Sequence, residues 1–201
     1  MSGEIIRSFA APFSGMSGIA WDGRHLWACE PNTNKIYQMD HNGVVVRSFA
    51  SPADDTRGIA WDGKHLWACD NGTDLIYQLT VNGVVIRSFA APASNNIGIA
   101  WDGKHLWACD LTSDLIYQMT VNGVVIRSFA APAGDTRDIA WDGKHLWACD
   151  IGTNLIYQLT VNGVVIRSFA GAGTDPLGIA FDGKHLWASD FTPSIIAQMR
   201  I

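Results

Sequence analysis

An acidic residue that could hold a metal ion recurs every forty residues in this sequence. Carboxylate oxygens are ligands that Ca²⁺ prefers, so a ring of such acids could form a calcium site. Each carboxylate could instead accept hydrogen bonds from backbone N–H groups of the turn that follows it. The second interpretation is favoured, because a structural role predicts the same residue in every copy. The acids are Glu30, Asp70, Asp110, Asp150 and Asp190, and the four aspartates are the candidate metal ligands.

Histidine and cysteine recur at the same interval. Imidazole and thiolate groups are ligands for zinc and other transition metals, and two thiols can form a disulfide. The cysteines show no C-x-x-C spacing, however, and a serine takes the place of a fifth one. The repeated histidines are His25, His65, His105, His145 and His185, and the cysteines are Cys29, Cys69, Cys109 and Cys149.

Three residues break the repeat where they could bind a ligand. Asp138 replaces the glycine found at positions 18, 58, 98 and 178, and Arg57 and Arg137 come directly before this position in their units. Acid–base catalysis needs different groups that converge on one centre, whereas repeated units supply the same groups in different directions. We therefore expect no catalytic residue and a small polar ligand at Arg57, Arg137 and Asp138. Neutral drift of exposed loop residues is the alternative.

The elements that carry these residues are themselves repeated. An aromatic residue followed by Asp-Gly stands at 21–23, 61–63, 101–103, 141–143 and 181–183. Segments 59–89 and 99–129 differ only at positions 71, 72, 73 and 79 and their counterparts. A period near forty is typical of propeller blades or of paired-helix arrays.

Four short apolar stretches in each unit decide between these architectures. GIAWD, HLWACD, LIYQLT and VVIRSFA are rich in β-branched and aromatic residues and are too short for helices, so they are predicted as strands a, b, c and d. Asp-Gly joins a to b, and Asn-Gly joins c to d, which favours two-residue hairpins with positive φ at their central residues. The sequence predicts an all-β, five-bladed β-propeller with four-stranded antiparallel blades.

The two ends of the chain predict how the ring closes. Residues 4–10 (EIIRSFA) match strand d, whereas the chain stops after a segment that matches strand c. We expect the N-terminal strand 4–10 to pair with the C-terminal blade 178–201 and to complete it, since this leaves no interrupted sheet. The whole chain, 1–201, is then a single domain.

The unit TRGIAWDGKHLWACDNGTDLIYQLTVNGVVIRSFAAP resembles the NHL-type repeat and the related repeats of streptogramin lyases and SMP-30-like propellers. The shared features are a Gly-Ile-Ala strand, a strand that ends in small-x-Asp, an Ile-centred strand and a Gly-led strand with Arg and Phe. The resemblance implies the fold, but proteins with such repeats serve as binding platforms, metal-dependent hydrolases or lyases. The Asn-His-Leu triplet is absent here, and the histidine and glutamate that the lyases use match no residue of this chain. The number of blades is also similar to that of tachylectin-type sugar-binding propellers.

Propeller geometry argues against metal binding by the repeated histidines and against disulfides. If strand b lies about 10 Å from the axis, equivalent atoms in adjacent blades are about 12 Å apart. Zinc–nitrogen bonds are about 2 Å long, and a disulfide needs Cα atoms within about 7 Å. We expect the imidazoles to pack against tryptophan and to bond within a turn, the thiols to be buried, and the tryptophans to form the core between blades.

The two faces of the predicted propeller differ in charge and variability. The d–a and b–c loops, which together define the loop face, vary between units, whereas the a–b and c–d turns on the opposite turn face do not. Only Lys35, Arg57 and Arg137 oppose the acids of the loop face. We expect a ligand there, preferably a cation, a cationic group or a polyol. The acids are Glu30, Asp54, Asp55, Asp70, Asp74, Asp110, Asp114, Asp135, Asp138, Asp150, Asp175 and Asp190.

These features favour a non-catalytic, highly symmetric scaffold or binding module, amplified recently from one blade or engineered. Its partner would be a small polar ligand or a protein at the acidic, variable loop face. The alternatives are a metal-assisted lyase or hydrolase of the streptogramin-lyase or SMP-30 type, and a multivalent sugar-binding lectin. Ca²⁺ is the cofactor that the acidic ring could bind, and the favoured binding module requires none.

Composition narrows the class of partner. The formal net charge of −5 argues against nucleic-acid binding, and no apolar run is long enough to span a bilayer. We expect a monomer. The first residues lack a basic stretch followed by an apolar one, so no secretory signal is predicted and the cytoplasm is the expected compartment.

Overall fold

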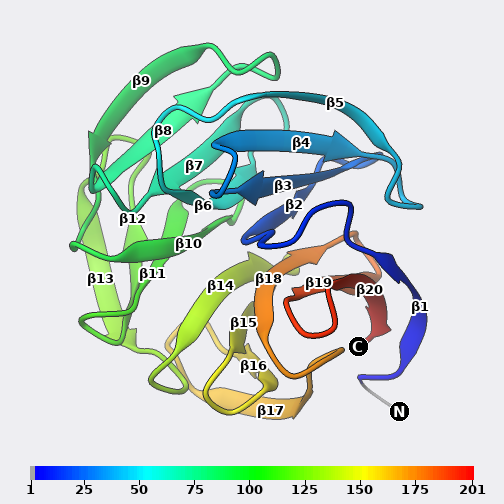
Figure 1. The fold of residues 1–201 in the computed structure, drawn as a ribbon. Coiled ribbons are helices and arrows are strands. Elements are labelled where there is room, and N and C mark those ends of the chain that lie inside the picture. The colour runs from blue at the N-terminus through cyan, green and yellow to red at the C-terminus, as the bar shows by residue number, and fades with distance from the viewer. Residues whose placement is uncertain (1–2) are drawn as a thin grey trace.

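The computed structural model describes residues 3–201, and all regular structure in this range is β-strand. The strands form five four-stranded antiparallel sheets around a central axis (Figure 1). Each sheet is one blade, with its first strand nearest the axis. The predicted five-bladed β-propeller is confirmed.

The blades are numbered from the N-terminal side. Blade 1 contains β2 (Ile19–Trp21), β3 (Leu26–Glu30), β4 (Lys35–Met39) and β5 (Val45–Ala50). Blade 2 contains β6 (Thr56–Trp61), β7 (Leu66–Asp70), β8 (Leu75–Leu79) and β9 (Val85–Ala90). Blade 3 contains β10 (Asn96–Trp101), β11 (Leu106–Asp110), β12 (Leu115–Met119) and β13 (Val125–Ala130). Blade 4 contains β14 (Thr136–Trp141), β15 (Leu146–Asp150), β16 (Leu155–Leu159) and β17 (Val165–Ala170).

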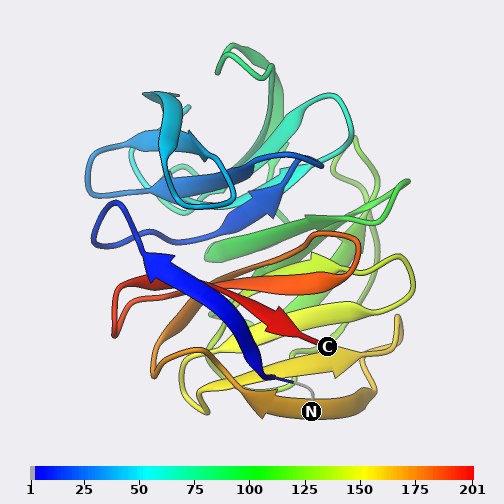
Figure 2. The same cartoon turned by 90° about the vertical axis from the view of Figure 1, so that its right-hand side faces the viewer.

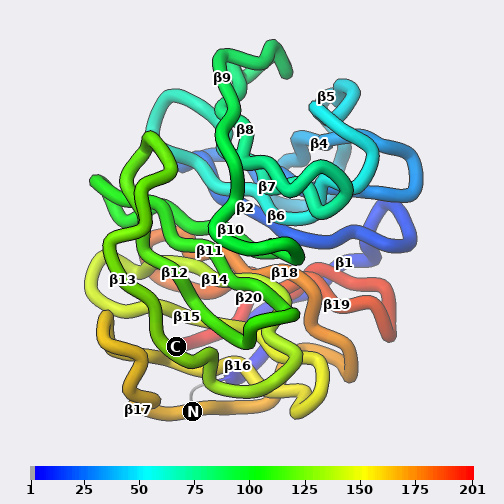
Figure 3. The backbone as a smooth tube through the Cα atoms, turned by 90° about the vertical axis from the view of Figure 1, so that its left-hand side faces the viewer, coloured from blue at the N-terminus to red at the C-terminus, as the bar shows by residue number. Residues whose placement is uncertain are grey.

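Blade 5 is built from both ends of the chain. It contains β18 (Pro176–Phe181), β19 (His185–Asp190) and β20 (Ile195–Arg200), and its outer strand is β1 (Ile5–Ala10). β1 pairs antiparallel with β20, for example Ser8 opposite Ala197, and the two strands run side by side in Figure 2. The predicted closure of the ring by the N-terminal strand is confirmed. The other outer strands, among them β9, β13 and β17, lie along the periphery in Figure 3.

The turns differ from the expected two-residue hairpins. β6 ends at Trp61 and β7 begins at Leu66, so the a–b connection of blade 2 spans four residues, and only Gly63 within it has positive φ. Asp62 N donates to His65 O across this connection at 3.1 Å. In the c–d connection Gly83 N donates to Thr80 O at 3.0 Å, which makes a β-turn followed by a left-handed glycine. The longer a–b turn forms because Asp62 Oδ1 accepts the N–H groups of residues 64 and 65.

The hydrophobic core lies between neighbouring blades. The strand-b tryptophan of one blade packs in the same cluster as the strand-a aromatic residue of the next, as Trp107 does with Trp141 and Trp187 with Trp21. The indole rings of Trp21 and Trp187 stack at a centroid distance of 6.2 Å. The five strand-b tryptophans are at most 1% exposed. Burial of these large rings stabilises every blade–blade contact, as expected from their position in mid-strand.

Among residues 3–201, no helix is long and apolar enough to cross a membrane.

Candidate functional site

A hollow of about 620 Å³ opens on the loop face, where the five inner strands begin. Its lining comes from the d–a loops, the starts of the inner strands and the b–c turns. The loop face was expected to carry a ligand, and this hollow lies on it. The lining residues are Gly15, Ser17, Pro31, Asn32, Asp55, Arg57, Ile151, Asp175, Leu177, Phe191 and Thr192.

The two symmetry-breaking arginines lie at equivalent positions but relate differently to this hollow. Arg57 lines it and has its Nε 2.8 Å from Asp55 Oδ1. Arg137 makes the same kind of ion pair, with Nη2 2.6 Å from Asp135 Oδ1, but is not part of the lining. The structure therefore does not bring the two predicted ligand-binding arginines together in one site.

Asp138 lies outside the hollow, in contrast to the sequence-based expectation. Its side chain is fully buried on the axis, below the ring of residues at which the inner strands begin. Asp138 Oδ2 accepts hydrogen bonds from the backbone N–H groups of Ile179, at 3.0 Å, and Ile19, at 3.4 Å. Burial raises the pKa of Asp138 well above its ordinary value of 3.8, against the opposite effect of backbone N–H donors. A ligand in the hollow does not reach this carboxylate.

The candidate metal ligands at the ends of the b strands are buried, and their carboxylates accept hydrogen bonds from protein donors. Asp70 Oδ1 accepts the backbone N–H and the hydroxyl of Thr73, each at 2.8 Å. Its Oδ2 accepts the N–H of Asp55 at 2.9 Å and the hydroxyl of Thr56 at 3.1 Å. Asp110 and Asp150 likewise accept the backbone N–H and hydroxyl of a residue in their own b–c turn and a backbone N–H of the d–a loop. These hydrogen bonds join the b–c turn to the preceding d–a loop.

The remaining members of the acidic ring follow the same pattern. Glu30 accepts the N–H groups of Asn32 and Thr33, and Asp190 accepts those of Asp175 and Thr192. Within residues 3–201, no three His, Cys, Asp or Glu side chains converge as a metal site. Each of these carboxylates accepts hydrogen bonds from its own b–c turn, which are the contacts that the turn interpretation predicts.

The loop face is less acidic than the residue count indicated. Of the twelve acids counted there, the strand-b acids and Asp138 are buried. Two of the others are neutralised by the ion pairs Asp55–Arg57 and Asp135–Arg137. Asp175 lines the hollow and accepts a hydrogen bond only from the hydroxyl of Thr174, at 3.4 Å, among the side-chain donors of the described residues. Asp54, Asp74 and Asp114 are exposed on the loop face but do not line the hollow, so Asp175 is the acid of the lining that a cationic ligand meets outside an ion pair with arginine.

The repeated histidines belong to a hydrogen-bonded network on the turn face. In blade 3, Asp102 Oδ2 accepts from the indole Nε1 of Trp107 at 2.8 Å and from Gln118 Nε2 at 3.2 Å. His105 Nδ1 lies 3.3 Å from both Asp102 Oδ2 and Gln118 Nε2. Gln118 Oε1 in turn accepts from Arg127 Nε at 2.8 Å. The imidazoles therefore bond within a turn as expected, but to side chains.

This network joins neighbouring blades as well. The Arg127 guanidinium lies 5.3 Å from the centroid of the Trp107 ring and donates to Asn162 in the c–d turn of the next blade, at 2.7 Å. Sequence analysis did not recognise this set, although Asp, His, Trp, Gln and Arg recur together in every unit. Their constant spacing was the available signal.

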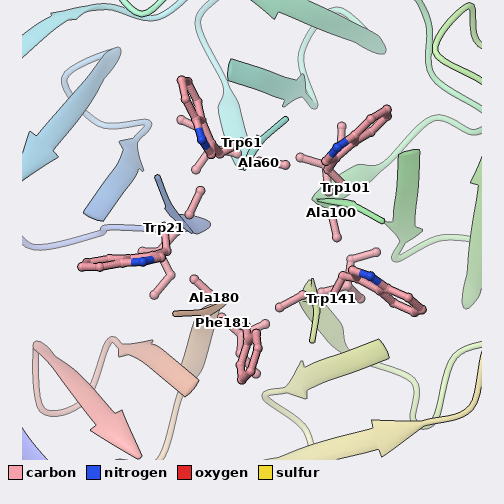
Figure 4. A pocket seen from close by; sticks show the side chains of 15 residues that line it. Trp21, Ala60, Trp61, Ala100, Trp101, Trp141, Ala180 and Phe181 are labelled. Carbon is pink, nitrogen blue, oxygen red and sulfur yellow. The ribbon is translucent and has the colours of Figure 1, made fainter. Parts of the chain in front are cut away.

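A second, smaller hollow of about 80 Å³ lies on the axis near the turn face. The last three residues of each inner strand line it, and its aromatic side chains radiate from the axis (Figure 4). Phe181 stands where the other blades have tryptophan. The aromatic side chains that line this hollow pack between blades, so they do not form a stacking platform for a sugar at the axis.

The position that follows the strand-b acid contributes several of the hollow's side chains, and sequence analysis did not single it out. This position differs in every blade, whereas its neighbours in strand b are nearly constant. Such variation beside an invariant strand was a usable signal. The residues are Pro31, Asn71, Leu111, Ile151 and Phe191. Pro31, Ile151 and Phe191 line the hollow.

Solved structures of several proteins resemble this fold. A glutaminyl cyclase from Myxococcus xanthus superposes with a TM-score of 0.85 at 12% identity, covering 98% of this chain and 95% of that one. A catalytically inactive variant of virginiamycin B lyase from Staphylococcus aureus, solved with quinupristin, gives a TM-score of 0.60 at 26% identity. That match covers 96% of this chain and 68% of the lyase. A streptogramin B lyase gives a TM-score of 0.58 at 22% identity, covering 96% of this chain and 67% of that one.

No family model and no curated protein matches the sequence. The structural neighbours confirm the resemblance to propellers of the streptogramin-lyase type, which the repeat motifs indicated. The glutaminyl cyclase, at 12% identity, supports the fold alone.

Proposed function

We propose that this chain is a non-catalytic binding module, a symmetric propeller that takes one small ligand in the loop-face hollow. The observation that carries this proposal is the asymmetry of the hollow. Its lining comes from blades 1, 2, 4 and 5 and consists largely of residues that differ between units. One asymmetric site on the axis of a repeated fold corresponds to one ligand per chain.

The repeated chemical groups support a binding role over a catalytic one. The strand-b carboxylates accept hydrogen bonds from turns, and the histidines bond to Asp and Gln side chains of their own blades. Groups held in this way cannot readily converge on a substrate. The nearly identical units support our further proposal that the chain arose by recent amplification of one blade or by engineering.

The lining favours a compact organic cation as the ligand. Ile151, Leu177 and Phe191 give an apolar wall, and the side chain of Phe191 is 53% exposed. Asp175 is the acid best placed to pair with a cationic group, because Asp55 is already paired with Arg57. An aromatic or aliphatic amine would place its apolar body on the wall and its charge near Asp175.

Thermal melts and two-dimensional amide NMR spectra with benzylamine as the probe test this proposal. A ligand at 100 times its dissociation constant adds about 2.7 kcal/mol to stability. We expect a saturable upward shift with one site per chain, which Asp175→Asn abolishes. Arg57→Leu removes a positive charge from the lining and releases Asp55 from its ion pair, so it should strengthen binding of the cation. Arg137→Leu is the matched control, since Arg137 has the same ion pair but does not line the hollow; it should leave binding unchanged.

Parallel samples with simple sugars, Ca²⁺, Mg²⁺, EDTA and quinupristin separate the alternatives. Several sugar sites per chain would support the lectin, and metal-dependent turnover of quinupristin would support the lyase. Either result, or a melt and spectra that benzylamine leaves unchanged, would contradict the proposal.

The expected monomer and compartment also remain proposals. The four cysteines are buried and free, which is in keeping with a reducing compartment such as the cytoplasm.

A further inference from the structure

The inner strands present unpaired backbone groups to the axis. Each inner strand pairs only with strand b on its outer side, so alternate N–H groups of its other edge point inward. The isoleucine that follows the glycine position takes the same register in all five blades. These pairs are Ile19 with Ala28, Ile59 with Ala68, Ile99 with Ala108, Ile139 with Ala148 and Ile179 with Ala188.

The carboxylate of Asp138 occupies the point toward which these N–H groups converge. Its Oδ2 accepts from Ile179 at 3.0 Å and from Ile19 at 3.4 Å, across the axis in blades 5 and 1. Ile179 lies in blade 5 and Ile19 in blade 1, so the carboxylate joins two blades besides its own. Asp138 comes from blade 4 but bonds mainly to other blades.

The second oxygen of the same carboxylate has no hydrogen-bond partner. Asp138 Oδ1 is buried and lies beside blade 3, where a Cβ on Gly98 would be 2.8 Å from it. A fully buried polar atom without a partner is rare in proteins. The hydrogen bonds reach the carboxylate only through Oδ2, so the N–H donors on one side and the close packing against blade 3 on the other position it.

Glycine at the equivalent positions of the other blades offers no acceptor for these buried N–H groups. Buried backbone N–H groups need acceptors, and convergent N–H groups form concavities that bind anions. A single carboxylate from blade 4 therefore serves N–H groups of two other blades. This requirement explains why the repeat is broken here once and not at several blades.

We propose that the isoleucine N–H groups on the axis form an anion-binding ring, that Asp138 is its built-in anion, and that a small monovalent carboxylate takes its place when residue 138 is glycine. Asp138→Gly removes a CH₂–COO⁻ group, so the space left has the size and charge preference of acetate. The ring lies below the loop-face hollow and does not depend on the ligand proposed for that hollow.

Thermal melts of Asp138→Gly at pH 8 and constant ionic strength test this proposal. We expect acetate and formate to raise its melting temperature with saturation, and gluconate, which is too large, to have no specific effect. Acetamide has the shape of acetate without its charge and should stabilise far less. Wild type and Asp138→Asn, whose side chains fill the ring, should not respond to acetate specifically.

An acetate titration followed by amide NMR gives a local readout. The amide signals of Ile19 and Ile179 should shift in Asp138→Gly and stay constant in wild type. Glycine occupies the equivalent position in the four other blades, which favours folding of Asp138→Gly. If Asp138→Gly does not fold, Asp138→Ala titrated with formate is the second variant. Equal stabilisation by acetamide, an acetate effect no larger than that of gluconate, or an equal response of wild type would each overturn the proposal.

Discussion

At the scale of single residues, carboxylates are the main side-chain hydrogen-bond acceptors in this fold. Their surroundings divide them into three groups. Asp70 and its equivalents tie the b–c turn to the d–a loop. Asp102 and its equivalents organise the a–b turn and the buried indole. Asp138 stands alone on the axis. Identical residue types thus serve different purposes according to which donors surround them.

The a–b turn aspartates should make stability sensitive to acid. Burial raises the pKa of Asp102, but hydrogen bonds from the His105 N–H, the Trp107 indole and the Lys104 N–H outweigh it and hold the pKa below 3.8. The folded state therefore binds this proton more weakly than the unfolded state. The stabilisation is fully present above about pH 4 and is lost as pH falls through the lower, folded-state pKa.

Urea unfolding of wild type and Asp102→Asn between pH 7 and pH 2.5 checks this expectation. The free energy of unfolding should differ most at neutral pH, and the two curves should approach each other as the pH falls below 4. A constant difference over this range would contradict the assigned role. The same direction of shift holds for Asp22, Asp62, Asp142 and Asp182.

The strand-b carboxylates should stabilise the fold without metal. Asp70→Asn turns one acceptor oxygen into an NH₂ group that faces N–H and O–H donors, which should cost about 1–3 kcal/mol in urea unfolding. Asp40→Thr is the control: Thr80 Oγ1 accepts from Asn82 N and Val84 N just as Asp40 Oδ1 does in its own turn, so the change should be near neutral. A wild-type melting temperature that rises with Ca²⁺ and falls with EDTA, with Asp70→Asn insensitive to both, would restore the calcium interpretation.

At the scale of elements, the inner strands set how closely the blades approach the axis. A Cβ on Gly98 would lie 2.6 Å from Asp138 Cα and 2.7 Å from Cys109 Sγ. These distances leave no room for a side chain between neighbouring inner strands. The glycine is thus needed for close approach of two blades, and not for an unusual backbone conformation.

Gly98→Ala should therefore destabilise the protein by about 1–3 kcal/mol, the range for overpacking a tight contact. Gly134 lies in a d–a loop, where an added Cβ meets only Asp114 Oδ1 at 4.0 Å. Gly134→Ala should change stability by less than about 0.5 kcal/mol. Denaturant midpoints of the two variants provide the measurement. Equal effects would show that the contact at Gly98 can accommodate a methyl group.

At the scale of the whole molecule, the ring holds together through one strand that is far away in sequence. β1 completes blade 5, where the guanidinium of Arg7 lies 4.9 Å from the Trp187 ring centroid and the ring of Phe9 lies 6.1 Å from it. Arg7 Nε also donates to Gln198 at 3.1 Å. Blade 5 thereby regains the contacts that the continuous chain provides in blades 1 to 4.

Deletion of residues 1–10 should cause severe destabilisation or exchange of strands between chains. It would uncover the edge of β20 and the Trp187 ring. Thermal melts and size-exclusion chromatography measure the two outcomes, and a monomer with unchanged melting temperature would contradict the closure.

A backbone-cyclised chain provides the positive control. Gly3 N donates to Arg200 O at 2.7 Å, as Gly163 N donates to Thr160 O at 3.0 Å in the c–d turn of blade 4. A peptide bond from Ile201 to Ser2, with Met1 removed, would give a connection of the same length as that turn. We expect this cyclic chain to fold and to melt at a higher temperature than the linear one, because closure lowers the entropy of the unfolded state.

The sequence by itself determined the strands, their order, the number of blades and the closing strand, because apolar stretches, turn residues and a forty-residue period are local signals. It also distinguished the two faces of the propeller, through loops that vary beside constant strands. Only the tertiary structure decided where individual polar groups lie. Asp138 meets Ile179 and Ile19, which are 41 and 119 residues away in the chain, so the convergence of blades, and not any local pattern, places its carboxylate on the axis and leaves Arg57 and Asp175 to line the hollow.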